Sequence, residues 1–482
     1  MLRFGRKKQV FIDWELVEPG YGVAWTGDAP GAWEMPTGVA LATHLPEVGT
    51  EPMVQADRPW ESWLNVYSSI FEDEGRYRLY YECHYDDGTD QDDYGAMLAY
   101  TESTDGINWT KPSVGTVEFE GSKDNNLVFG LDRSLGRGAH GATVFKDPSA
   151  PPDQRYKLVH MGKDKGVDSV YGAVSPDGLR WTALQEPVVP GYFSDTQTVA
   201  RFDEDLGRYV GYFRGWTQHE RGRAHGRRTI ARGESDRFDA WQDPVQVVAP
   251  DIHDAPDTDI YTNSYSPWPD ADAHLLFPAY YQRTRDICEI HMLTSRDGHH
   301  WQRPIRDPVV PAGPPGSDSE GSYYAGAGLV SMRPGQVSLP VGPVWHTHNE
   351  QHHDSSDPER HTGYLVQATW RRDGFASLEA ESAGSFTTVP FTFEGGSLQV
   401  NAWTRFGGEL SVELVDASTA TMKEAGTTVA GKTFADCDAI TGDHLETTIS
   451  WGGDSDLSAW AGKQVRLRFR MRRARLYALQ FV

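Results

Sequence analysis

Cysteine is scarce in this chain, whose 482 residues include only Cys83, Cys288 and Cys437. An odd number of widely separated cysteines builds no disulfide framework, and we expect small buried side chains instead. No apolar run reaches the roughly 18 residues that a membrane helix needs. Basic residues are also few, because 45 Lys and Arg face 69 Asp and Glu, for a net charge of −24. These features argue against a nucleic acid or an anionic membrane as partner.

Helical segments of normal length are missing as well, whereas 49 Gly, 29 Pro and 12% aromatic residues favour strands joined by many turns. The basic stretch at residues 3–8 is not followed by an apolar core, because acidic residues interrupt residues 11–15. We therefore expect no signal peptide and a cytoplasmic protein. A leader removed from a longer precursor is the alternative.

One short frame recurs along the chain: a Ser, an Asp one or two places later, and a Trp six places after the Ser. Its four copies are Ser103–Trp109, Ser175–Trp181, Ser235–Trp241 and Ser295–Trp301. Each copy follows an apolar stretch typical of a strand, and in three of them Asp-Gly suits a tight turn. A decayed copy at residues 370–375 extends the series. Because repetition at a long period indicates one supersecondary unit stacked several times, we predict an all-β fold, a five-bladed β-propeller with a C-terminal β-sandwich.

We expect three parts in the chain. Residues 1–55 are rich in Gly and Pro and form an irregular lead-in that packs on the propeller. Residues 56–379 form the propeller, which is the catalytic domain. Residues 380–482 contain short alternating apolar runs between Gly-Gly and Asp turns, which is typical of a β-sandwich.

The first strand of each predicted blade lines a central channel, so polar side chains on these strands converge although they are far apart in sequence. Alignment of the strands puts amide and imidazole groups at one level: Asn65, His140, Gln197 and Asn263. Such a ring suits the recognition of sugar hydroxyls. The alternative is that these groups hydrogen-bond one another or bind water within a narrow channel.

Four carboxylates lie near the starts of these strands: Glu61, Asp195, Asp259 and Glu320. Glycoside hydrolysis needs one protonated acid and one ionised carboxylate, and close carboxylates push their pKa values apart, which divides those roles. Asp195 is the strongest candidate, because it begins a predicted inner strand beside Gln197. For each carboxylate alone, the alternative is a turn or capping acid in a strongly acidic chain.

Further polar residues are expected to contact the substrate at the same mouth: Arg214, Tyr280, His346 and His348. His346 and His348 share one face of a predicted strand and offer metal-binding chemistry, but we expect them to touch sugar and expect no metal or cofactor. Glu82 and Asp147 lie in Glu-Cys and Lys-Asp-Pro sequences at the end of a second strand and in a turn. We expect both to be structural.

The chain resembles the five-bladed glycoside hydrolases of family 32, which includes invertases and fructan hydrolases, and of family 43, which acts on arabinans and xylans. Residues 69–81, the Ser frames and the C-terminal β-sandwich carry this resemblance. Over about residues 60–482 the chain is most similar to bacterial proteins described as family-32-like. The stretches that match these proteins are 120–126, 195–197, 261–263 and 294–298. The resemblance implies that paired carboxylates hydrolyse a furanoside bond, as in fructose- or arabinose-containing substrates, without a cofactor.

Two positions depart from the family pattern. Asn65 stands where invertase-like enzymes carry a catalytic Asp on the first inner strand, and His140 stands near their second-blade acid. Only the third-blade acid has a counterpart, which is Asp195. The resemblance then implies that Asp195 pairs with Glu61 or Asp259, while Glu320 and His140 assist.

Two other functions stay open. One is a non-catalytic carbohydrate-binding propeller, which the missing family acids favour. The other is a sialidase-like enzyme, whose three-Arg clamp the aligned inner strands do not supply. The expected partner is an oligosaccharide or glycoside, and an oligomer is compatible with the sequence.

Overall fold

The computed structural model describes residues 2–20, 35–85, 96–130, 138–164, 166–220, 223–349, 363–420 and 425–482. Apart from three single-turn 3-10 helices (Pro152–Gln154, Ala417–Thr419 and Ser458–Trp460), the regular structure in these ranges is β-strand, which confirms the all-β class. In these ranges no helix has the length and apolar character needed to cross a membrane.

The chain divides into two compact units. The terminal unit comprises Met1–His44, Pro267–Ala273 and Trp370–Val482, and the propeller unit comprises Leu45–Ser266 and His274–Thr369. The predicted division at residues 55/56 and 379/380 stays a prediction.

Three four-stranded antiparallel sheets follow one another in the first part of the propeller unit, and each is a meander of consecutive strands. The first contains β6 (Trp63–Asp73), β7 (Arg76–His84), β8 (Met97–Ser103) and β9 (Leu127–Phe129). The second contains β10 (Thr143–Lys146), β11 (Tyr156–Asp164), β12 (Val167–Ser175) and β13 (Thr182–Ala183). The third contains β14 (Val199–Asp203), β15 (Arg208–Glu220), β16 (Arg223–Ser235) and β17 (Val245–Val248).

The later strands of this unit form one long sheet and one short sheet. The long sheet contains β18 (Thr258–Ile260), β21 (Ala279–Gln282), β22 (Ile287–Ile290), β24 (Ser322–Ala325), β25 (Gln336–Val344), β26 (Tyr364–Arg371), β4 (Glu47–Val48) and β5 (Val54–Gln55). The short sheet contains β19 (Tyr265–Pro267), β20 (His274–Leu276) and β23 (Leu293–Ser295). The parallel pair of Cys288 and Ser322 joins β22 to β24 within the long sheet.

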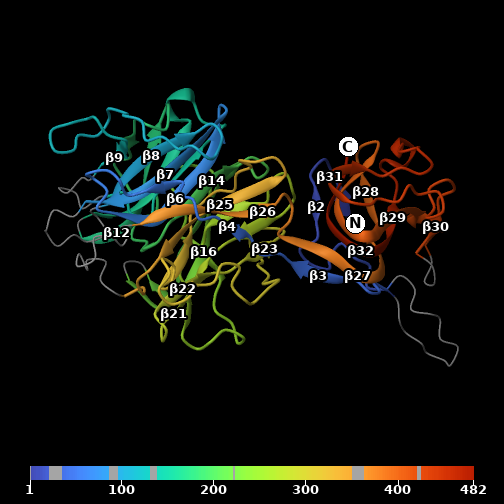
Figure 1. The fold of residues 1–482 in the computed structure, drawn as a ribbon. Helices are drawn as coiled ribbons and strands as arrows, with labels where there is room; N and C mark the ends of the chain where they lie inside the picture. The colour runs from blue at the N-terminus through green and yellow to red at the C-terminus, as the bar shows by residue number, and fades with distance from the viewer. Residues whose placement is uncertain are drawn as a thin grey trace. The chain divides into compact units, whose positions relative to one another are not determined.

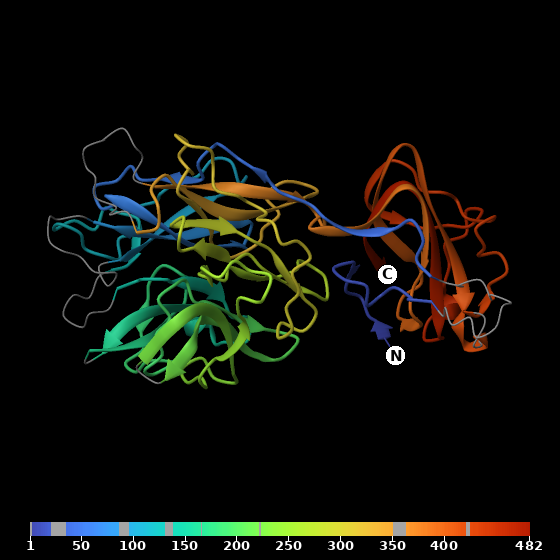
Figure 2. The same cartoon turned by 90° about the horizontal axis from the view of Figure 1, so that it is seen from below.

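The inner segments of these sheets contact one another in chain order, and the last returns to the first. The hydrogen bonds that join them are Val144 N to Ser69 Oγ (3.1 Å), Thr198 N to Gly141 O (3.1 Å), Asn263 Nδ2 to Gln197 O (3.0 Å), Ser264 Oγ to Gly326 O, and Ala327 N to Ser68 O (2.7 Å). The sheets are therefore arranged around a common centre, and the predicted propeller-like arrangement is confirmed (Figures 1 and 2).

The repeated Ser-x-Asp-Gly frame builds the same turn three times. The Ser103 hydroxyl accepts a hydrogen bond from Gly106 N at 2.9 Å, while Asp105 Oδ1 accepts two from the next backbone amides, Ile107 N and Asn108 N, both at 2.8 Å. The frames at Ser175 and Ser295 repeat this pattern. Side-chain oxygens that bond nearby backbone amides favour turns over strands, so the frame fixes where each sheet reverses.

The terminal unit holds one nine-stranded sheet, in which strands from the start and the end of the chain pair. Its strands are β1 (Leu2–Phe4), β2 (Gln9–Val10), β3 (Ala40–Thr43), β27 (Ala376–Thr387), β28 (Phe391–Phe393), β29 (Leu398–Asp416), β30 (Thr427–Thr428), β31 (Asp443–Thr448) and β32 (Val465–Phe481). β1 runs parallel to β28, and β3 runs antiparallel to β27, so N-terminal strands pair with C-terminal ones at both ends of this strand order. Figure 2 shows the blue N-terminal segment beside the orange and red strands. The C-terminal β-sandwich stays a prediction.

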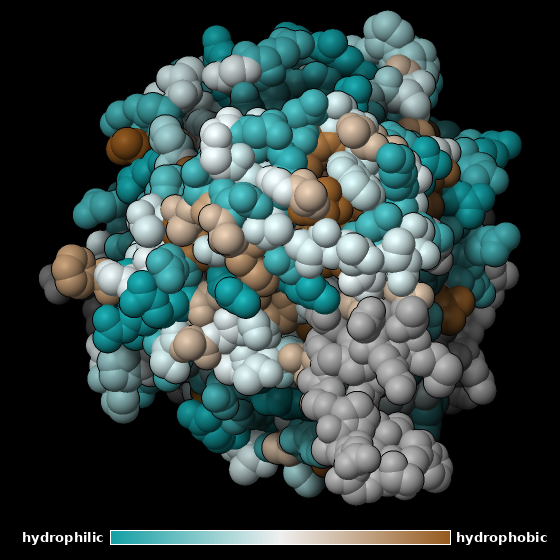
Figure 3. Space-filling model, turned by 90° about the vertical axis from the view of Figure 1, so that its right-hand side faces the viewer, coloured by the Kyte–Doolittle hydropathy of each residue, from teal (hydrophilic) through white to brown (hydrophobic). Residues whose placement is uncertain are grey.

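Hydrophilic residues cover most of the face drawn in Figure 3, and apolar residues lie there singly or in small groups. The apolar side chains of the terminal unit gather inside it instead, where Phe386 stacks on Phe469 and Phe393 stacks on Phe481. Burial of such rings is the main favourable contribution to folding.

Candidate active site

A fully buried carboxylate, Glu82, lies where the first two sheets of the propeller unit meet. Its Oε2 accepts a hydrogen bond from Gly141 N at 2.7 Å, and its Oε1 accepts one from Asn65 Nδ2 at 2.8 Å. His84 Nε2 and His140 Nδ1 lie 2.9 and 3.1 Å from the same Oε1. Burial alone would raise the pKa of Glu82, but the two histidines, His140 above all, outweigh it and hold the pKa well below its usual range. Glu82 is therefore an ionised group inside the protein.

His140 connects this buried carboxylate to a second one that reaches solvent. Its Nε2 lies 3.4 Å from Asp195 Oδ1, an ion-pair distance, and the Asp195 side chain is 24% exposed. Arg214 Nη1 lies 3.2 Å from Asp195 Oδ2. Burial raises the pKa of Asp195, but His140 and Arg214 together lower it below its ordinary value. Asp195 is consequently an ionised carboxylate that a ligand can reach.

Two guanidinium groups and an aromatic pair adjoin Asp195. The buried Arg214 guanidinium lies over the Tyr261 ring at 4.1 Å and over the Trp216 ring at 5.8 Å. Arg228 lies over the same two rings, at 4.9 and 5.4 Å. Trp216 stacks on Phe193 with the ring centroids 6.0 Å apart, and both rings are half-buried. A half-buried aromatic pair beside polar groups offers a stacking surface for a flat apolar face.

His348 completes the cluster on another side. Its ring lies 4.6 Å from Tyr261 and 4.6 Å from Tyr281, and its Nδ1 lies 2.9 Å from the Tyr324 hydroxyl. Burial lowers the pKa of His348 to about 4, and the charges of Arg228 and Arg214 act in the same direction. The imidazole is therefore neutral at pH 7, where it can serve as a hydrogen-bond partner.

Asp259 contacts the other side of the Arg228 guanidinium and, unlike Asp195, has no access to solvent. Its side chain is fully buried, Arg228 Nη1 lies 2.9 Å from its Oδ2, and Arg283 Nη2 lies 2.7 Å from its Oδ1 and 3.0 Å from its Oδ2. Bidentate contact with one Arg and a second cation make this a closed charge cluster. Asp259 thus fixes the position of Arg228 beside the aromatic rings.

Glu61 belongs to a different network. Its Oε1 accepts a hydrogen bond from the Tyr81 hydroxyl at 2.6 Å, and its Oε2 accepts bonds from Asp57 N, Arg58 N and Lys111 Nζ at 3.0, 3.2 and 2.7 Å. Among the contacts recorded in the described ranges, none joins Glu61 to Asp195. The carboxylate ties the segment before β6 to the first sheet.

Glu320 is also placed apart from Asp195. Its exposed side chain accepts a hydrogen bond from Gly316 N at 2.7 Å, which closes a local turn. Of the four predicted carboxylates, Asp195 alone reaches both solvent and His140, and the catalytic roles of the other three stay predictions.

The amides of the predicted ring serve the framework. Gln197 Nε2 donates to the backbone carbonyls of Ser68 and Ala142, at 2.7 and 3.0 Å. Asn263 Nδ2 donates to the carbonyls of Gln197 and Tyr212, at 3.0 and 3.2 Å. These bonds cross from one sheet to another and satisfy buried backbone acceptors. Asn65 and His140 differ, because their partner is the Glu82 carboxylate.

Two other expected substrate contacts lie elsewhere in the propeller unit. Tyr280 is buried, with its ring stacked on His291 at 4.0 Å and covered by Arg303 at 5.5 Å. Its neighbour Tyr281 points to the other face of the strand, as alternation requires, and meets His348. His346 Nδ1 lies 2.9 Å from Thr347 O, and its ring lies 5.4 Å from that of Trp345. The roles of Tyr280 and His346 in substrate binding stay predictions.

Sequence reasoning set Glu82 aside, although it lies at the centre of this cluster. A usable signal was present: residues 82 and 84 are polar, alternate along one strand and therefore share its face, and the opposite strand carries Asn65. Three hydrogen-bonding side chains at one end of this strand pair indicate a buried polar network.

Known proteins offer little guidance. Neither protein-family models nor curated proteins match the sequence. Among solved structures, one described as a glycoside hydrolase is 13% identical, with a TM-score of 0.49, over 68% of this chain and 92% of its own. A GH43_1 enzyme from Xanthomonas citri is 15% identical (TM-score 0.45; 67% and 90% covered). An N-acetylgalactosamine deacetylase from F. plautii is 13% identical (TM-score 0.44; 70% and 97% covered). Similarities of this size describe neither the reaction nor the substrate of this chain.

Proposed function

We propose that this protein is a glycoside hydrolase whose active site is built around Asp195. The observation that carries the proposal is the combination of charge and access at this one residue. Its side chain is 24% exposed, whereas those of Glu61 and Asp259 are fully buried. His140 and Arg214 favour its ionised form, which is the form that general-base or nucleophilic catalysis requires.

Asp195 is the group that meets the substrate in the proposed reaction. The ionised carboxylate removes a proton from the water that attacks the sugar as the glycosidic bond breaks. The leaving oxygen takes a proton from solvent water, which matches the proton that Asp195 receives. His140 does not reach the leaving oxygen, because its Nε2 is buried and lies 3.4 Å from Asp195 Oδ1. Glu82 and His140 therefore position Asp195 and do not touch the substrate.

Two finer features belong to the same proposal. The furanoside-type substrate is supported by the sequence resemblance at residues 195–197 and 261–263. The count of five blades is supported by contacts among five inner segments in a closed series. These segments are 68–69, 141–144, 197–198, 263–264 and 326–327. The half-buried Trp216 and Phe193 rings supply a stacking face for the sugar.

The test is the hydrolysis of aryl arabinofuranosides, aryl fructofuranosides, fructans and arabinans by the wild type and by Asp195→Asn. We expect the wild type to release sugar and the variant to lose about 10²–10⁴-fold in kcat/KM. Glu204→Gln is the matched control, because this exposed carboxylate lies in the turn between β14 and β15. Equal turnover by wild type and Asp195→Asn would contradict the proposal.

A non-catalytic carbohydrate-binding propeller is the second candidate. It is favoured by the state of the nearest further carboxylates, since Glu82 is buried and Asp259 is held by two arginines. No second accessible carboxylate accompanies Asp195 among the contacts that the described residues make. This alternative predicts calorimetric binding of the same oligosaccharides by the wild type without any product.

A further inference from the structure

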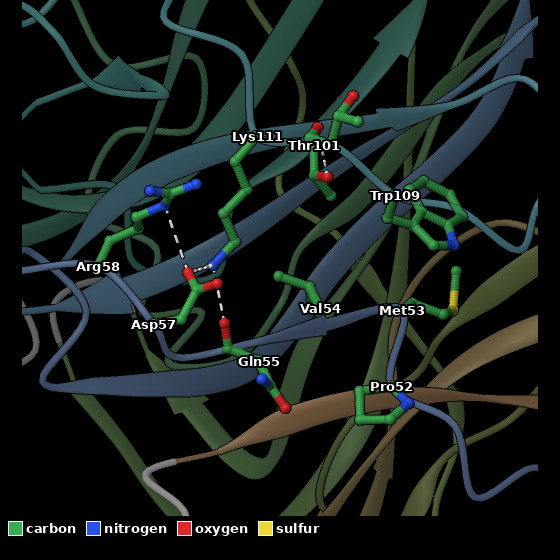
Figure 4. Close-up of a pocket in the computed structure, with 10 residues that line it drawn as sticks. Pro52, Met53, Val54, Gln55, Asp57, Arg58, Thr101, Trp109 and Lys111 are labelled. Atoms are coloured by element: carbon green, nitrogen blue, oxygen red, sulfur yellow. Dashed lines mark hydrogen bonds and ion pairs between the residues drawn. The ribbon is translucent and has the colours of Figure 1, made fainter.

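A pocket of about 540 Å³ opens in the propeller unit at a place that the Asp195 cluster does not share. Its walls come from two segments, residues 52–58 around β5 and residues 101–111 around the end of β8 (Figure 4). None of the residues that contact Asp195 lines it. The volume lies within the range of sites for small molecules.

Charges in this pocket are balanced. Lys111 Nζ donates its three hydrogens to Gln55 O, Asp57 Oδ1 and Glu61 Oε2, each at 2.7 Å. Arg58 Nε lies 3.4 Å from Asp57 Oδ1, and Figure 4 shows its two terminal nitrogens on the side away from that carboxylate. Glu61 does not line the pocket, but it neutralises Lys111 from behind the wall, so two cations are matched by two anions. The ammonium has no donor left for an anionic ligand. This balance favours a neutral, polar occupant.

The opposite wall is aromatic. Trp109 lines the pocket with Met53 and Val54. Its side chain is half-buried, while its indole Nε1 is buried. The exposed part of the indole therefore offers an apolar ring surface to a ligand.

We propose that this pocket is a second carbohydrate-binding site, which takes one neutral sugar unit. The apolar face of a sugar ring stacks on the Trp109 indole. Its hydroxyls accept hydrogen bonds from the Arg58 guanidinium and donate to the Asp57 carboxylate. A neutral polyol ring with one apolar face matches both the aromatic wall and the charge balance. The site binds without catalysis and stands independently of turnover at Asp195.

The experiment measures binding to the full chain that carries Asp195→Asn, so that no probe is consumed. Methyl α-L-arabinofuranoside, methyl β-D-fructofuranoside and methyl β-D-xylopyranoside are the neutral probes, D-glucuronate is the anionic probe, and saturation-transfer difference NMR with calorimetry gives the affinities. We expect at least one neutral probe to bind and Trp109→Ala to weaken it by about tenfold or more. Arg58→Ala, a change at a side chain that is 44% exposed, should weaken it severalfold while thermal melting stays unchanged.

Trp181→Ala is the matched control. Trp181 holds the same place in the next repeat, is likewise half-buried against an apolar cluster, and does not line the pocket. We expect its variant to bind the neutral probe like the parent. Equal affinities in the Trp109→Ala and Trp181→Ala variants, a preference for glucuronate, or binding of none of the neutral probes would each overturn the proposal. None of these outcomes depends on whether Asp195 catalyses hydrolysis.

Discussion

Glu82 and Asp195 show how surroundings divide roles between two carboxylates on either side of one imidazole. Glu82 is enclosed and receives four hydrogen-bonding groups, whereas Asp195 has an open side. Both are held ionised, because His140 lies near each of them. The buried member therefore acts on the chemistry only through His140, and the open member meets the ligand.

The Glu82→Gln variant tests this division. The change removes the anion that holds His140 beside Asp195. Because His140 lowers the pKa of Asp195, that pKa should rise toward its ordinary value. A general base is active only in its ionised form, so activity is lost as the pH falls through its pKa. Because the pKa of Asp195 rises, the acidic limb of the kcat/KM profile should move to higher pH. We also expect the free energy of unfolding to fall by about 2–4 kcal/mol, because the Gly141 amide and two histidines lose an ionised partner.

The control for this variant is Asp147→Asn. Asp147 is equally buried and accepts bonds from Ser149 N and the Tyr209 hydroxyl, at 2.9 and 2.5 Å. Its loss should lower stability in urea titrations and leave the acidic limb in place. A Glu82→Gln profile that coincides with the wild type would show that Glu82 is only structural.

Sequence alone could indicate Asp195, because it begins an inner strand, but it could not rank Glu82. A buried ionised carboxylate is stable only when it is hydrogen-bonded. Two of the partners of Glu82, His140 and Gly141, belong to another sheet and lie about sixty residues further along the chain. The spacing of residues 82 and 84 shows which face they share, yet it cannot show what packs there. The same holds for the amide of Gln197, whose partners are backbone carbonyls of two other sheets.

At the scale of elements, the inner segments approach so closely that some positions tolerate only glycine. Gly141 has φ +62°, and a Cβ there would lie 2.1 Å from the Thr196 carbonyl oxygen of the next sheet. Gly328 has φ +102°, and a Cβ there would likewise lie 2.0 Å from the Ile70 carbonyl oxygen. Glycine at these points lets neighbouring sheets come together around the centre.

Gly141→Ala is therefore expected to destabilise the propeller unit by about 3 kcal/mol or more, since strain at positive φ and a backbone collision add. Gly75→Ala is the control, because Gly75 has φ +78° but nothing within 4 Å of the added Cβ. The free energy of unfolding of that variant should fall by only about 1–2 kcal/mol, which is the cost of an alanine in the left-handed backbone conformation. Urea unfolding of both variants measures the difference, and equal losses would contradict the proposed close approach.

The repeated turns were predictable from sequence, and the strand partners were not. The Ser-x-Asp-Gly frame contains every group that its turn uses, so local residues suffice. By contrast, β1 pairs with β28 and β2 pairs with β32. Such pairings join residues almost four hundred or more positions apart and leave no local pattern. The lead-in was accordingly predicted as irregular, although residues 2–4, 9–10 and 40–43 form strands.

Across the whole molecule, acidification acts through buried and half-buried histidines whose pKa values are lowered. His44 in the terminal unit and His291 and His348 in the propeller unit each have a pKa lowered to about 4, in every case chiefly by burial. An unfolded His titrates near pH 6.5. Between these values the unfolded chain binds more protons than the folded one, so the free energy of unfolding must fall as the pH falls through this window.

We expect His291 to contribute a loss of about 1–2 kcal/mol between pH 6.5 and pH 5, and His348 a similar one. Carboxylates whose pKa values lie below 4 stay ionised over this interval, so they do not mask the effect. Urea unfolding at pH 6.5 and pH 5 measures it. His291→Phe, which retains a ring against Tyr280, should reduce the pH dependence, whereas His253→Gln at an exposed position should leave it unchanged. If the free energy of unfolding is the same at both pH values, these imidazoles bind protons equally in the folded and the unfolded protein. Their pKa values in the folded protein would then not be lowered, which would contradict the burial that the packing indicates.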